Sequence, residues 1–213
     1  MCAHFESITD PKRFKTAFNS ELPEGASFDV WPSYHSSFIR LNSSNEQNSN
    51  ISNPYESLTG SFGLIPHWSK DAKIAKFTYN ARIETVANKP SFKDAWRLKR
   101  LCIIPAESIY EPDWRSGRAV STRIYRSDLM PMGIAGIWTG WRAPGGEIIR
   151  SFSMLTLNAD HHALMKNFHK PGEEKRMVAI LKEKDYSNWL RSTDDSCLQY
   201  IKPLEADLLS TST

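Results

Sequence analysis

Short apolar runs separated by turn-forming residues dominate the pattern of hydrophobic and polar positions along this chain. Runs of strand length, bounded by glycine, proline or polar residues, predict strands at 101–104, 122–126, 133–138, 148–157 and 176–181. The turn Ala143-Pro144-Gly145-Gly146 joins two of these strands into a hairpin. Many short strands with few helices favour an α+β fold: a mostly antiparallel, barrel-like β-sheet core with a few peripheral helices.

Helices are predicted at four places. The pair Asp10-Pro11 indicates a helix start, because aspartate caps a first turn and proline fits inside it. Three further helices are predicted at 90–100, from Asn158 or Asp160 to Phe168, and at 183–191.

The length of 213 residues fits one domain, predicted to span residues 1–213. Residues 42–53 are nearly all asparagine and serine with some glutamate and glutamine, which predicts a polar surface loop. Residues 205–213 are expected to form a flexible tail. No internal repeat, GxGxxG sequence or P-loop is present.

Composition excludes several classes of protein. No apolar run reaches the roughly 18 residues of a membrane span, and the first residues show no signal-peptide core. The three cysteines Cys2, Cys102 and Cys197 are widely spaced, which argues against a disulfide scaffold and a zinc site. The same cysteine pattern is typical of a reducing compartment, so we expect a cytoplasmic protein. Adjacent His161 and His162 would diverge on a helix, so we expect no metal site, and no cofactor is expected.

Charge is unevenly distributed, although the net charge is only +3. The segment 70–100 holds nine basic and three acidic residues, and several tryptophans lie within or near it. Such a surface can bind a polyanion and stack on bases. A solvated helix face and ordinary core packing explain the same residues equally simply.

Cys2 is the most suggestive chemical group. Removal of Met1, which is typical before a small second residue, would leave an α-amine and a thiol on adjacent carbons. The amine has a pKa near ~8 and the thiol near ~8.5, so both are nucleophiles at neutral pH. The amine would condense with an aldehyde to give an imine. The thiol would then add to the same carbon and close a thiazolidine ring. From the residue alone, the simpler interpretation is that Cys2 is merely the residue that follows the start.

Three further positions can carry chemistry. In an extended segment, Asn80, Arg82 and Glu84 share one face and could clamp a phosphate, or form only an internal ion pair. Glu111, between Tyr110 and Pro112, could have a raised pKa and act as acid or base, or form a surface salt bridge. His169 could be catalytic or simply cap a helix.

Taken together, these motifs resemble the SRAP family, the SOS-response-associated peptidase domain that shields abasic sites in DNA. The resemblance covers nearly the whole chain. Its motifs are the Met1-Cys2 start, Asp29-Val30-Trp31-Pro32, Phe62-Gly63-Leu64-Ile65-Pro66-His67-Trp68, Asn80-Ala81-Arg82-Ile83-Glu84-Thr85, Cys102-Ile103-Ile104-Pro105-Ala106 with Tyr110-Glu111, and His169 with Arg176-Met177.

The resemblance implies covalent capture of an abasic site in single-stranded DNA by a monomer, through a thiazolidine on the mature N-terminal cysteine. It also implies N-terminal self-processing, and association with the nucleoid when DNA is bound. The implied catalytic residues are Cys2, Asn80, Glu111 and His169. The implied DNA-binding residues are His4, Trp68, Arg82, Lys89, Trp114 and Arg176.

Four positions depart from the family pattern: Ala3-His4 after the cysteine, Phe62 for a leading tryptophan, Pro112-Asp113 after Glu111, and an insertion at 170–175. Two other functions fit the same residues. One is a cysteine peptidase or amidase that uses Cys2, His169 and Asn80. The other is a non-covalent single-strand binder that relies on the segment 70–100.

Overall fold

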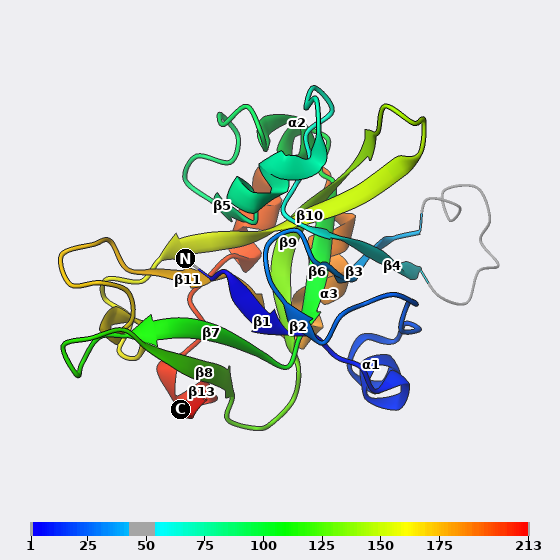
Figure 1. Ribbon diagram of the computed structural model, residues 1–213. Coiled ribbons are helices and arrows are strands. Elements are labelled where there is room, and N and C mark those ends of the chain that lie inside the picture. The colour runs from blue at the N-terminus through cyan, green and yellow to red at the C-terminus, as the bar shows by residue number, and fades with distance from the viewer. Residues whose placement is uncertain (1, 43–53, 213) are drawn as a thin grey trace.

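A closed β-barrel forms the centre of the computed structural model, which describes residues 2–42 and 54–212 (Figure 1). Its strands are β3 (His35–Leu41), β4 (Tyr55–Phe62), β6 (Leu101–Ala106), β9 (Met132–Arg142) and β10 (Ile148–Asn158). They pair in the order β10-β4-β3-β6-β9, and β9 pairs with β10 to close the circle. Only the β4–β10 pair is parallel among these five contacts. The predicted α+β, barrel-like and mostly antiparallel fold is therefore confirmed.

Three short strands extend this barrel sheet. β5 (Asn80–Arg82) runs parallel to β10, β11 (Arg176–Val178) runs antiparallel to it, and β12 (Ile180–Leu181) pairs with β9. Ala179 separates β11 from β12, because its N–H bonds to β10 while its carbonyl bonds to β9. The strand predicted at 176–181 is thus divided between two neighbours.

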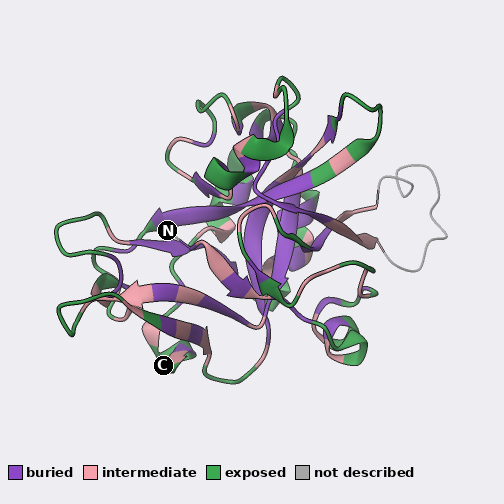
Figure 2. Cartoon of the chain, in the orientation of Figure 1, coloured by how far each residue is buried: buried purple, intermediate pink, exposed green. Residues whose placement is uncertain are grey.

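A second, antiparallel sheet packs beside the barrel in the order β13-β8-β7-β1-β2. Its strands are β1 (His4–Glu6), β2 (Asp29–Val30), β7 (Ser108–Asp113), β8 (Val120–Arg126) and β13 (Leu209–Ser212). Phe5 on β1 meets Phe62 on β4 edge to face, with ring centroids 5.1 Å apart. The two sheets therefore share one apolar core. Figure 2 shows buried residues, coloured purple, on strands of both sheets.

The described residues form three α-helices, which lie outside the barrel: α1 (Pro11–Phe18), α2 (Lys93–Arg97) and α3 (Tyr186–Arg191). The carboxylate of Asp10 accepts hydrogen bonds from two amides of the first turn of α1, as the sequence predicts. Trp189 on α3 is fully buried and donates its indole N–H to the Cys102 carbonyl of β6 at 2.9 Å. α3 therefore covers one face of the barrel.

The helix predicted from Asn158 or Asp160 to Phe168 is wrong, because this segment holds only the 3₁₀ turn Met165–Asn167. His162 explains the difference: its Nδ1 accepts from the amides of Leu164 and Met165. A side chain that takes these amides competes with the carbonyls of a regular helix. The other 3₁₀ segments are Ala72–Phe77, Glu183–Asp185, Asp195–Tyr200 and Ala206–Leu208.

The flexible tail predicted at 205–213 is also wrong for the described part of that segment. Leu209 to Ser212 form β13, which pairs with β8 over four residues, and Leu209 is 7% exposed. Burial of one leucine and pairing with an open strand edge hold this end in place. The polar loop predicted at 42–53 lies outside the described residues except for Asn42. In the described ranges, no helix has the length and apolar character needed to cross a membrane.

Candidate functional site

The four predicted catalytic residues converge from distant parts of the sequence. Cys2 precedes β1, Asn80 begins β5, Glu111 lies on β7, and His169 lies in the loop that leads to β11. All four are buried, with exposed fractions between 1% and 8%. They form a compact polar cluster at the boundary between the barrel and the second sheet.

Strand pairing places Cys2 near Glu111. His4 lies opposite Tyr110 and Phe5 opposite Ile109, in an antiparallel register. Continuing this register towards the N-terminus brings residue 3 opposite Glu111. Accordingly, burial first and the charge of Glu111 second raise the pKa of the Cys2 thiol well above its usual range. The thiol donates a hydrogen bond to the His4 carbonyl at 3.4 Å.

Asn80 fixes the backbone of Cys2. Its Nδ2 donates to the Cys2 carbonyl at 2.6 Å, a contact between residues 78 positions apart. Its Oδ1 is buried, and no donor in the described ranges reaches it. A buried acceptor without a donor is unfavourable. This oxygen is therefore an open position for a polar group of a ligand.

Glu111 has the pKa expected of an acid–base catalyst. Its side chain is buried, and the loss of hydration raises its pKa to about 7. A carboxyl with a pKa close to neutral is present in both protonation states at neutral pH. Such a group can donate a proton in one step and accept one in the next.

His169 contacts Glu111 through one ring nitrogen and the backbone through the other. Its Nε2 lies 2.9 Å from the Arg176 carbonyl, and its Nδ1 lies 3.4 Å from Oε2 of Glu111. Because a carbonyl only accepts, Nε2 carries the hydrogen and Nδ1 turns its lone pair towards Glu111. Burial lowers the pKa of His169, so the ring is neutral at neutral pH. The pair can therefore share the proton of Glu111.

The SOS response associated peptidase (SRAP) family model matches residues 1–212. The chain belongs to the SRAP family. Abasic site processing protein YoqW of Bacillus subtilis is 32% identical over 218 residues, covering 97% of this chain and 89% of YoqW. A solved structure from Bordetella bronchiseptica has a TM-score of 0.88 at 38% identity and covers 99% of this chain and 98% of its own. The mouse protein HMCES, also named an abasic site processing protein, is 27% identical over 68% of this chain and 48% of its own length.

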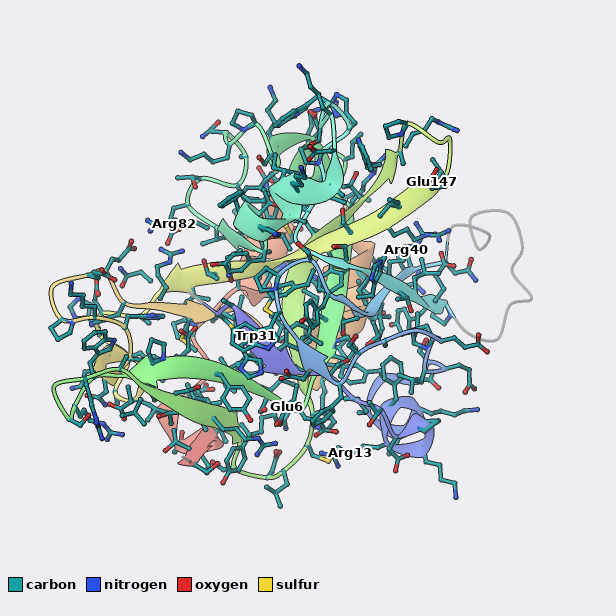
Figure 3. The ribbon with its side chains drawn as sticks, in the orientation of Figure 1. Glu6, Arg13, Trp31, Arg40, Arg82 and Glu147 are labelled. Atoms are coloured by element: carbon teal, nitrogen blue, oxygen red, sulfur yellow. The ribbon has the colours of Figure 1, made fainter. Side chains whose placement is uncertain are left out.

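Three of the residues that the SRAP resemblance assigns to DNA contact are exposed. Trp68 is 48% exposed and donates its indole N–H to the Pro90 carbonyl at 3.3 Å, next to exposed Lys89. Trp68 lines a groove of about 800 Å³ that also contains Arg97 and Arg100. Arg82 projects from β5 at the surface of the molecule (Figure 3), with 47% of its side chain exposed.

His4 does not project into solvent as a DNA-contacting residue would. Its ring is stacked between Trp31 and Tyr110, with centroids 4.1 and 4.2 Å apart, and its Nε2 contacts the carboxylate of Asp29. Trp31 lies over β1 and β2 in Figure 3 and donates its indole N–H to the same carboxylate at 3.0 Å. The sequence signalled Asp29 and Trp31 only as a family motif. His4 packs the N-terminal strand in the structure, and its contact with DNA stays a prediction.

Arg176, which the SRAP resemblance assigns to DNA contact, is almost completely buried. It is 2% exposed, and its guanidinium forms two 2.9 Å hydrogen bonds to the carboxylate of Glu84. It also donates to Glu174 and to the Thr156 carbonyl, each at 2.8 Å. Direct contact with DNA would require displacement of a carboxylate. Trp114 is half-buried just after β7, so its expected stacking on a base stays a prediction.

Proposed function

We propose that this protein processes abasic sites in single-stranded DNA by capturing the sugar aldehyde on the mature N-terminal cysteine. The observation that carries the proposal is the buried cluster in which Glu111, with a pKa of about 7, lies beside both Cys2 and His169. The names of the relatives YoqW and HMCES support the substrate. In this proposal the peptidase of the family description corresponds to removal of Met1, and the protein acts as a monomer.

The pKa of the thiol sets the order of the steps. Above neutral pH an α-amine is partly unprotonated, whereas burial and Glu111 keep the Cys2 thiol protonated. The amine therefore attacks C1′ of the ring-opened sugar first and gives a carbinolamine. Glu111 protonates the hydroxyl that leaves as water, which gives a protonated imine and the Glu111 carboxylate. The sulfur then bonds to C1′, the electron pair of the C=N double bond moves to nitrogen, and the thiol proton passes to the Glu111 carboxylate, which restores the acid.

Asn80 and His169 act on the reacting groups from either side. The hydrogen bond from Asn80 to the Cys2 carbonyl holds the terminus in place, and the open Oδ1 can accept from the amine. His169 holds Glu111 and exchanges a proton with it through Nδ1. The product retains no aldehyde, so the strand is protected from β-elimination.

A cysteine peptidase that uses Cys2, His169 and Asn80 fits the geometry less well. Such an enzyme needs a thiolate paired with a histidine. Here the thiol donates to the His4 carbonyl and its pKa is raised, while the two ring nitrogens of His169 face Arg176 and Glu111.

The groove beside Trp68 favours DNA binding as a second function, and that binding would weaken as salt is added.

The proposal is tested with an oligonucleotide whose single uracil is converted to an abasic site by uracil glycosylase. We expect the mature wild-type protein to give a shifted band on a denaturing gel. The untreated uracil strand, which has no aldehyde, is the matched control and should give none. A wild-type protein that leaves the abasic strand unshifted would refute covalent capture.

Asn80→Ala is expected to slow adduct formation about tenfold, the effect of losing one buried hydrogen bond of roughly 1 kcal/mol or slightly more. The Cys2 carbonyl would lose its 2.6 Å partner, and the terminus would sample unproductive positions. Single-turnover kinetics on the abasic strand measure the change. Asn88→Ala, an exposed asparagine eight residues further along, is the control. Equal rates for the two variants would contradict this role of Asn80.

A further inference from the structure

One carboxylate bridges two arginines beside the proposed site. Oε2 of Glu174 lies 2.8 Å from Nη1 of Arg82, and Oε1 lies 2.8 Å from Nη1 of Arg176. The arginines belong to β5 and β11, which both pair with the last residues of β10. Two oxygens of one anion, each held by a different guanidinium, are the arrangement that a phosphate diester also adopts between arginines.

This bridge lies close to the residues that hold the proposed reactive terminus. Arg82 lies two residues after Asn80 on the same strand, so the two side chains leave the same face about 6.6 Å apart. Asn80 holds the Cys2 carbonyl, and the carbonyl of Arg176 holds His169. Arg82 is therefore two residues from the side chain that holds the reactive terminus, and the backbone of Arg176 holds the histidine beside Glu111.

Glu174 is the replaceable partner of this network. Its side chain is 36% exposed, whereas that of Arg176 is 3% exposed, so the carboxylate lies on the solvent side of the buried guanidinium. Arg176 is held independently by Glu84 and by Thr156. When Glu174 moves away, Arg176 therefore keeps its place and presents Nη1.

We propose that Glu174 occupies the place of a DNA phosphate, and that the strand must displace it from Arg82 and Arg176 in order to bind. This inference rests on the proposed function and adds a residue that sets the affinity for DNA. Glu174 lies in the segment 170–175 that departs from the SRAP pattern. Because the phosphate replaces the carboxylate of Glu174, a strand that carries a phosphate at this position binds more tightly than a strand that lacks one.

The test measures binding of a labelled oligothymidylate without an abasic site, by fluorescence anisotropy, so that no covalent step contributes. Glu174→Gln keeps the size of the side chain and removes its charge. Glu173→Gln removes the same charge from an exposed neighbour in the same loop and is the matched control. We expect Glu174→Gln to bind roughly three- to fivefold tighter than Glu173→Gln, the range of partly exposed ion pairs. In an Arg82→Ala background, the advantage of Glu174→Gln should shrink, because only Arg176 is then left for the carboxylate and the phosphate to compete for.

The outcomes separate this inference from the function on which it rests. If wild type binds and the two glutamine variants bind equally tightly, or Glu174→Gln binds more weakly, Glu174 is a structural anchor of the loop and the inference is wrong. If wild type does not bind the strand at all, the proposed function fails and takes the inference with it. Thermal melting of both variants verifies that they are folded.

Discussion

Cys2→Ala is expected to abolish the denaturation-resistant adduct with abasic single-stranded DNA completely. Alanine keeps the α-amine, so an imine can still form, but no sulfur is present to close the ring and make the bond stable to denaturation. Binding of the undamaged strand should stay within twofold of wild type, because Cys2 is buried and its protonated thiol carries no charge that could attract a phosphate. A denaturing gel and an anisotropy titration measure the two effects separately.

Two further variants complete this experiment: a control, and a variant that separates the role of the amine from that of the thiol. Cys197→Ala removes another buried thiol that lies outside the cluster, and its adduct should form as in wild type. A variant with one extra residue retained before Cys2 keeps the thiol but turns the amine into an amide. We expect it to form no adduct. A variant of this kind that crosslinks normally would show that the thiol acts alone, as in a peptidase.

Glu111→Gln is expected to lower the rate of adduct formation by about 10²–10⁴-fold, the usual contribution of a general acid–base group. Glutamine has the same shape but cannot transfer a proton. For wild type, the rate should depend on pH through a group with a pKa near 7, and this dependence should disappear in the variant. Glu147→Gln at an exposed turn is the control. A wild-type rate profile that is flat between pH 5 and 9 would contradict the assignment.

The same substitution should make the protein more stable, with a definite pH dependence. The pKa of Glu111 is raised by folding from 4.5 to about 7. The native state therefore binds this proton more tightly, and wild-type stability falls as pH rises between these values. Above pH 7 the penalty is complete, on the order of 3 kcal/mol if the whole shift is expressed. Thermal melting should give equal Tm values for wild type and Glu111→Gln near pH 4, and a higher Tm for the variant at pH 8.

The strands could be predicted from the sequence because each carries its own signal. Residues 101–104 are apolar throughout, as expected for a strand that the barrel buries on both faces, and residues 148–157 mix apolar with polar residues over the length of a strand. The helix expected at 158–168 shows the limit of such patterns. Its apolar spacing suits a helix, but His162 binds two of the amides that a helix would need. That contact depends on the orientation of the His162 side chain, which the spacing of apolar residues does not reveal.

The residues of the candidate site could be proposed from the sequence, but the contacts between them could not. Cys2, Glu111 and His169 were each suggestive as residue types, and the family motifs selected them. The bond from Asn80 to Cys2 and the pair of Arg176 with Glu84 join residues 78 and 92 positions apart. Only the folded chain brings them together. For the same reason the sequence could not show that His4 is stacked between two aromatic rings or that Arg176 is already paired with carboxylates.

The buried, protonated state of the Cys2 thiol also bears on how long the protein remains usable. Peroxide and alkylating agents attack thiolates, and both the raised pKa and the absence of solvent access leave little thiolate at this position. In the proposed reaction each molecule captures one aldehyde and is then consumed, so oxidation of its sulfur beforehand would inactivate it. Burial of the thiol therefore protects the group that the proposed reaction needs until the substrate binds.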